Sequence, residues 1–266
     1  MGAAPERGRL TGAGGLAQTV LVTGASGFVG RALCPHLAAQ GFSVRRAVRR
    51  AQEPSADCVA VGDLSPRTDW TPALTGMEGV VHLAARVHVM RESSADPAAE
   101  FRRVNVEATA HLARSAAAAG VRRLVFLSSV KVHGEFGERP FNEADPPRPE
   151  DPYGMSKWEA EQELAQVGRA TSMQWTVLRP PLIYGPGVKA NFLGLMHAVA
   201  RSLPLPLGAI RNRRSLLYLG NLVDAIRVCL VHPAAANQVY LVSDGLPLVA
   251  APLPLRLKTL MAIQVE

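Results

Sequence analysis

The chain has 266 residues, of which 48% are hydrophobic, so it is long enough to bury a core in one large domain, with or without a small lobe. Its formal net charge of +7 comes from arginines scattered in ones and twos, which argues against a nucleic-acid-binding surface. No apolar stretch is long enough to span a membrane, and the three cysteines have neither a disulfide nor a metal-ligand spacing. We therefore expect a cytoplasmic globular protein with no nucleic-acid partner, no membrane insertion and no metal.

The first predicted strand and helix enclose a glycine motif. Apolar residues at 20–22 predict a buried strand, and Gly24, Gly27 and Gly30 follow it. The first glycine allows the turn out of the strand, the second lets a pyrophosphate approach the backbone, and the third lets the next helix pack closely on the sheet. That helix is predicted over 28–39, with its N-terminal N–H groups facing the phosphates. The motif predicts a bound dinucleotide, and an ordinary strand-turn-helix is the alternative.

The second predicted strand, residues 42–48, ends in Arg49 and Arg50. In a dinucleotide fold this point meets the adenosine ribose, where an acid favours a free 2′-hydroxyl and an arginine favours a 2′-phosphate. The arginines therefore favour NADP(H) over NAD(H), although arginine pairs are also common on surfaces. A third predicted strand, residues 58–61, leads to Asp63, which could accept a hydrogen bond from the adenine amine or be a plain turn residue.

A fourth strand is predicted over 79–83, and the small residues Ala84 and Ala85 after it would let the cofactor lie against the backbone. One long helix over 97–119 and a fifth strand over 123–127 follow. This alternation predicts an α/β fold of the Rossmann type, a doubly wound parallel sheet with helices on both faces. Ligands would then bind at the carboxyl ends of the strands.

Tyr153 and Lys157 lie four residues apart in a predicted helix that follows Pro152, so their side chains share one face. A tyrosine with the ordinary pKa of about 10 is a poor base at neutral pH. A lysine one turn away and an oxidised nicotinamide ring would both lower that pKa. Ser129, after the fifth strand, could hydrogen-bond the same substrate oxygen. The three residues predict proton transfer at an alcohol coupled to hydride transfer; a tyrosine and a lysine on a solvated helix face are the alternative.

The motifs along the chain resemble the extended short-chain dehydrogenase/reductase family, in particular its nucleotide-sugar epimerase, dehydratase and ketoreductase branch. They are TGASGFVG at 23–30, HLAA at 82–85, VNVEAT at 104–109, SSVKVHG at 128–134, YGMSK at 153–157 and LRPPLIYGPG at 178–187. The resemblance implies that Tyr153 is the catalytic base or acid, that Lys157 holds the ribose, and that Ser129 binds the reacting oxygen. It also implies dinucleotide contacts, alongside the glycines and Arg49, at Phe28, Val29, Asp63, Leu64, Leu83, Ala84, Ala85, Asn105 and Pro180.

The resemblance divides the chain into a flexible leader (1–17), a dinucleotide-binding domain (18–180) and a small substrate lobe (181–266). Asn191 opens an apolar helix where relatives hold a nucleotide diphosphate. Arg214 falls where an arginine meets that diphosphate, and a guanidinium matches phosphate in geometry. It belongs to a basic cluster, so which arginine faces the ligand stays open. The proline-rich end of the chain predicts a shortened, truncated lobe.

Val130 and Lys131 occupy the positions at which sugar 4,6-dehydratases carry an Asp-Glu pair, so the resemblance argues against dehydration. What remains is NAD(P)-dependent hydride transfer at one carbon, C4 of a UDP-linked sugar, by a 4-epimerase or a 4-keto reductase that supplies surface polysaccharide precursors. The arginines after the second strand favour exchangeable NADPH and hence the reductase. A dinucleotide-binding module with weak activity and a reductase of a non-sugar carbonyl compound are the alternatives. The resemblance also implies a homodimer.

Overall fold

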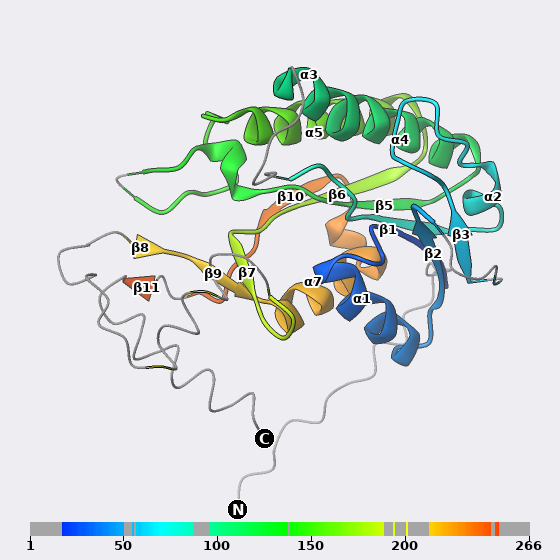
Figure 1. The fold of residues 1–266 in the computed structure, drawn as a ribbon, viewed down its shortest axis with the longest axis horizontal. Helices are drawn as coiled ribbons and strands as arrows, with labels where there is room; N and C mark the ends of the chain where they lie inside the picture. Colours follow the sequence, from blue (N-terminus) through cyan, green and yellow to red (C-terminus); the bar gives the residue numbers. More distant parts are fainter. Residues whose placement is uncertain are drawn as a thin grey trace, which may run out of the picture.

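The computed structural model describes residues 18–50, 55, 57–87, 96–137, 139–188, 194, 201, 213–245 and 248–249. At its centre is a seven-stranded sheet in the order β10-β6-β5-β4-β1-β2-β3, with every neighbouring pair parallel (Figure 1). The strands are β1 (Thr19–Thr23), β2 (Ser43–Val48), β3 (Cys58–Ala60), β4 (Gly79–His82), β5 (Arg123–Leu127), β6 (Gln174–Arg179) and β10 (Gln238–Leu241). The predicted doubly wound parallel sheet is confirmed.

Helices cover both faces of this sheet (Figure 1). On one face lie α1 (Phe28–Ala39) and α7 (Leu219–Val231), and on the other α4 (Ala108–Ala118) and α5 (Pro152–Ala170). A short helix α2 (Thr71–Leu74) precedes β4. Each face has its own apolar core, because the buried leucines of α1 and α7 pack in one cluster and those of α4 and α5 in another. No helix in the described part of the chain is both long and apolar enough to cross a bilayer.

The order of the strands reverses between β1 and β4. From β1 the chain moves outward to β2 and β3, and then returns to place β4 on the other side of β1. In open α/β sheets, ligands bind at the carboxyl ends of the strands beside such a reversal. The glycine turn after β1 and the loop after β4 therefore meet at the expected position of a cofactor.

The predicted long helix over 97–119 is present, but its middle is π-helical. The structure has α3 (Pro97–Phe101), a π-helical segment (Arg102–Glu107) and then α4. The wider π-helical turn carries Asn105, whose amide makes hydrogen bonds to the loop after β4 and to α5. Such segments are common at functional sites, and the sequence periodicity carries no signal for the extra residue in the turn.

The second half of the chain adds two small sheets. Strand β7 (Leu182–Tyr184) pairs with β9 (Leu216–Tyr218), and β8 (Arg213–Arg214) pairs with β11 (Leu248–Val249). Strand β10 and helix α7, although beyond the predicted boundary at residue 180, belong to the central sheet and its covering layer. The predicted domain boundaries stay a prediction. The leader, Asn191 and the proline-rich end lie outside the described residues.

Replacing Leu164 with alanine tests the core on the α5 side. Leu164 is 0% exposed, so Leu164→Ala is expected to lower the free energy of unfolding by about 2–5 kcal/mol, measured by urea denaturation. Met155 lies on the same helix but is 43% exposed, and Met155→Ala is expected to cost about 1 kcal/mol or less. Equal losses in the two variants would contradict this packing.

Candidate active site

The turn from β1 into α1 forms a cradle of bare backbone. Gly24 has a φ of +68°, and a Cβ added to it would lie 2.8 Å from the backbone nitrogen of Ala84. A Cβ on Gly30 would overlap the carbonyl oxygen of Gly24. Gly27 is the N-cap of α1 and has no side chain to cap the first turn, in which Phe28 and Val29 present their N–H groups. A pyrophosphate needs this combination of close backbone and helix N-terminus, so the residues present fit a dinucleotide.

The other predicted dinucleotide contacts follow β2, β3 and β4. Arg49 Nη1 lies 3.9 Å from Asp63 Oδ1, and the two side chains are 82% and 85% exposed. An arginine and an acid therefore face each other at the edge predicted to hold the adenosine. The loop after β4 is tied to β1, because Ala84 N donates to Thr23 Oγ1 at 3.3 Å. The remaining members of this set are partly buried: Leu64, Leu83, Ala84 and Ala85.

A buried histidine beneath the cradle escaped the sequence analysis. His82 ends β4, and its Nδ1 and Nε2 lie 2.6 Å from Thr23 Oγ1 and 2.9 Å from Thr109 Oγ1. Burial lowers the pKa of His82 to about 3, so the imidazole is neutral and bridges the two hydroxyls. It thereby joins β1, β4 and α4 under the cofactor site. The HLAA motif at 82–85 contained this histidine, but the motif does not indicate what the histidine contacts.

The side-chain amide of Asn105 makes its hydrogen bonds to other protein groups. Its Oδ1 accepts from Arg86 N at 2.8 Å, and its Nδ2 donates to Arg86 O at 3.0 Å and to Ser156 Oγ at 2.9 Å. The amide thus ties the loop after β4 to α5, and its contact with the dinucleotide stays a prediction. The Arg86 guanidinium lies 5.6 Å from the ring centroid of Phe101, whose ring is 6.2 Å from that of Tyr153. No sequence motif indicates this cation near the tyrosine.

Ser129, Tyr153 and Lys157 come together from two elements. Ser129 follows β5 and caps a 3₁₀ turn (Val130–His133), whereas Tyr153 and Lys157 lie in the first two turns of α5. Tyr153 hydrogen-bonds Ser129, which lowers the tyrosine pKa, but desolvation outweighs this bond and raises the pKa to about 12. The sequence predicts a lowered pKa for Tyr153, and the protein alone does not supply it. Lowering requires the positive charge that an oxidised nicotinamide would bring.

Lys157 is almost fully enclosed, with 2% of its surface exposed. Its Nζ lies 4.3 Å from the ring centroid of Phe126. Burial lowers the pKa of Lys157 to about 7, and the carboxylate of Glu161, one turn further along α5, acts in the opposite direction. The lysine charge therefore depends on its surroundings, and a hydrogen-bonding partner such as a ribose hydroxyl would favour the ammonium form.

A buried ion pair fixes α5 against two strands. Glu161 and Arg179 have side chains 3% and 4% exposed, with Glu161 Oε2 and Arg179 Nη2 2.5 Å apart. Ser128 at the end of β5 donates to Glu161, and Arg179 Nη1 lies 2.8 Å from His133 Nε2. The next residue after Arg179, Pro180, is buried, and its carbonyl accepts from Val130 N at 2.9 Å. These contacts place Ser129 and the helix of Tyr153 in a fixed relation.

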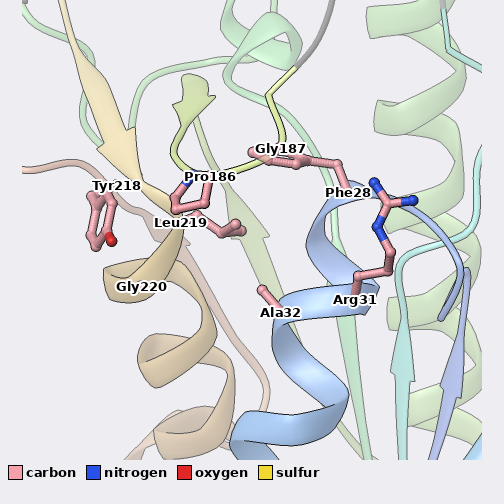
Figure 2. Close-up of a pocket in the computed structure, with 8 residues that line it drawn as sticks. All are labelled: Phe28, Arg31, Ala32, Pro186, Gly187, Tyr218, Leu219 and Gly220. Carbon is pink, nitrogen blue, oxygen red and sulfur yellow. The ribbon is translucent and has the colours of Figure 1, made fainter. Parts of the chain in front are cut away.

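A cavity of about 290 Å³ adjoins the glycine cradle (Figure 2). It lies between the first turns of α1, the loop after β7 and the start of α7, and its lining residues are Phe28, Arg31, Ala32, Pro186, Gly187, Tyr218, Leu219 and Gly220. The cavity extends the cradle toward the predicted substrate lobe. Arg214, predicted to bind a diphosphate, has an exposed side chain in β8 and does not line this cavity. Among the described residues, no cluster of three or more acidic, histidine or cysteine side chains is arranged to hold a metal ion.

Glu161→Gln is expected to lower the free energy of unfolding by about 3–5 kcal/mol, because it leaves the Arg179 charge buried without its counter-ion. The measurement is chemical denaturation near neutral pH. The matched control is Arg122→Gln, which breaks a pair between Arg122 and Glu78 whose side chains are 48% and 39% exposed. That loss is expected to be about 1 kcal/mol or less. A Glu161→Gln variant as stable as this control would contradict the assigned role of the buried pair.

Comparison with known proteins agrees with this geometry. A sequence model of the NAD dependent epimerase/dehydratase family matches residues 20–243. A UDP-glucose 4-epimerase of Vibrio cholerae is 45% identical over 240 residues, which make up 88% of this chain and 73% of that protein. An N-acetyl-alpha-D-glucosaminyl-diphospho-ditrans,octacis-undecaprenol 4-epimerase of Escherichia coli O157:H7 is 32% identical over 223 residues, 83% of this chain and 66% of that protein.

A solved structure, MoeE5 in complex with UDP-glucuronic acid and NAD, has the same fold, with a TM-score of 0.78 and 28% identity. The match covers 92% of this chain and 82% of that one. The expectation of a nicotinamide adenine dinucleotide cofactor is confirmed, because the matching family depends on NAD and the similar structure holds it. With the cradle and the serine, tyrosine and lysine in place, the chain belongs to the NAD-dependent epimerase/dehydratase family of enzymes.

Proposed function

We propose that this protein interconverts the two C4 epimers of a UDP-linked sugar and keeps its NAD bound between turnovers. The observation that carries the proposal is the set of Ser129, Tyr153 and Lys157, with Ser129 after β5 in the same parallel sheet whose β1 leads into the glycine cradle, in a chain 45% identical to a UDP-glucose 4-epimerase. The products would serve as precursors for surface polysaccharide.

The chemistry assigns one task to each residue. Tyr153, as the phenolate, takes the proton from the C4 hydroxyl, while Ser129 hydrogen-bonds the same oxygen. NAD, when bound, accepts the hydride from C4 and gives it back. Once the keto sugar has presented its other face, Tyr153 returns the proton to the oxygen. The reaction has no net oxidation, so a bound cofactor needs no replacement.

The UDP part of the substrate is assigned to the second half of the chain. Arg214 remains our proposed contact for the diphosphate, since an exposed guanidinium can bind phosphate oxygens in a bidentate manner. Asn191 is proposed for the same group by resemblance alone. The cavity beside α1 is lined by Phe28, which follows Gly27 of the cradle, and by Pro186 and Gly187 after β7, which supports a substrate that approaches the cofactor from the second half of the chain.

A 4-keto reductase that consumes NADPH is the second candidate. Arg49 and Arg50 favour it, because they end the strand that would meet a 2′-phosphate. Asp63 weakens this argument, since its carboxylate lies 3.9 Å from the Arg49 guanidinium and competes with a 2′-phosphate for that cation.

The two candidates differ in their demand for cofactor. Purified protein should convert UDP-glucose to UDP-galactose with no NADPH added. The conversion is measured by chromatographic separation of the two sugar nucleotides. A reductase would instead consume one NADPH for each UDP-4-keto sugar reduced. Conversion of no UDP-sugar, with NAD still bound, would overturn the proposal in favour of a binding module or a non-sugar reductase.

Tyr153→Phe is expected to lower kcat for epimerisation by about 10²–10⁴-fold, because the variant lacks the group that moves the proton. The affinity for NAD, measured by titration calorimetry, should stay within a few-fold of the original protein. Tyr240→Phe is the control, since Tyr240 Oη donates to Ala234 O at 3.0 Å in a contact outside the proposed site. Unchanged turnover in Tyr153→Phe would contradict the mechanism.

A further inference from the structure

Lys131 links the two elements that carry the proposed catalytic residues. Its Nζ lies 2.6 Å from Asp151 Oδ2 and 2.5 Å from Glu135 Oε1. Asp151 is the N-cap of α5, and its other carboxylate oxygen accepts from Gly154 N at 2.6 Å. One oxygen of this carboxylate therefore holds the helix that carries Tyr153, and the other holds the lysine.

The backbone of Lys131 also lies at the site. Lys131 N donates to Ser129 Oγ at 3.2 Å. A Cβ added to Gly154 would come within 2.7 Å of Lys131 O, so the 3₁₀ turn and the first turn of α5 approach as closely as bare backbone allows. Lys131 is thus next to both Ser129 and the turn of Tyr153.

Two opposite charges act on Tyr153 from this corner. The Asp151 carboxylate raises the tyrosine pKa and the Lys131 ammonium lowers it. Glu135, which also pairs with Lys131, adds a second carboxylate at this corner. Lys157 lies one turn further along α5, and the Arg86 guanidinium lies 5.6 Å from the ring centroid of Phe101, whose ring is 6.2 Å from that of Tyr153. Without Lys131, the negative charge of Asp151 would act on Tyr153 with no offset from this corner and would oppose formation of the Tyr153 phenolate.

We propose that Lys131 is a positioning residue that offsets the Asp151 carboxylate and so lets Tyr153 release its proton to start the sugar reaction. This inference rests on the proposed function, in which Tyr153 acts as the base. The lysine stands at a position where, by resemblance, dehydratases carry an acid of their water-eliminating pair. A lysine at this position is compatible with the proposed epimerisation, which needs Tyr153 as the base and no second acid.

A charge cycle between Lys131 and Asp151 tests the proposal. Lys131→Met leaves the Asp151 and Glu135 carboxylates without their shared cation, which disfavours the phenolate, so the rising limb of kcat/KM against pH should move up by about 0.5–1 pH unit. Asp151→Asn keeps a side chain that can cap α5 but removes the negative charge, so the limb should move down. The double variant should return to within a few tenths of a unit of the original limb, and Lys131→Arg should leave it in place.

Arg139→Met is the matched control. Arg139 Nη2 lies 2.5 Å from Asp145 Oδ1, and Asp145 also accepts from Asn142 N at 2.9 Å, so this change likewise removes a cation from a turn-capping carboxylate. The rising limb of kcat/KM against pH is expected to stay in place in Arg139→Met. A Lys131→Met variant with lower kcat and an unmoved limb, or one that Asp151→Asn does not correct, would overturn the proposal and leave a purely structural lysine.

A second readout separates this inference from the sugar assignment. In NAD-loaded protein, the ultraviolet absorbance of the phenolate is followed against pH, with the Tyr153→Phe form of each variant as the blank. The titration should move upward in Lys131→Met even if no UDP-sugar is converted. Such a result would support Lys131 and overturn only the substrate, whereas an unmoved titration would overturn the role of Lys131 itself.

Discussion

The buried pair of Glu161 and Arg179 is the interaction on which the geometry of the site depends. Two charges removed from water lose several kcal/mol of hydration each, and only close hydrogen bonding offsets that cost. Here the carboxylate also accepts from Ser128, so one group fastens the ends of β5 and β6 to α5. Ser129 follows directly after Ser128, at the end of one fastened strand, and Tyr153 lies two turns before Glu161 on the fastened helix. Their mutual distance is thereby set by the core.

Two glycines let separate segments of the site meet through their backbones. Gly24 meets the backbone of Ala84 below the cofactor cradle, and Gly154 meets the backbone of Lys131 beside the tyrosine. Each contact joins segments that are distant in the sequence and leaves no space for a Cβ. Bare backbone can approach a ligand or another strand more closely than any side chain permits. Glycine at these positions therefore fixes how the cofactor and proton-transfer parts of the site fit together.

Burial sets the protonation of three groups at the site. Burial keeps His82 neutral, draws the pKa of Lys157 to about 7 and raises that of Tyr153 to about 12. Each shift has the same cause, since a low-dielectric environment disfavours the charged form. In the proposed mechanism, the positive charge of an oxidised nicotinamide would lower the pKa of Tyr153, and the Lys131 and Asp151 charges would adjust that pKa further.

Local pattern determined the alternating strands and helices, the glycine turn and the placement of Tyr153 one turn before Lys157, because each follows from spacing within a short segment. The motif order also indicated the family. Tertiary structure alone decided the π-helical segment around Asn105, the hydroxyl partners of His82 and the pairing of Lys131 with Asp151. These features depend on which side chains meet across separate elements after packing, and periodicity within one segment carries no information about that meeting.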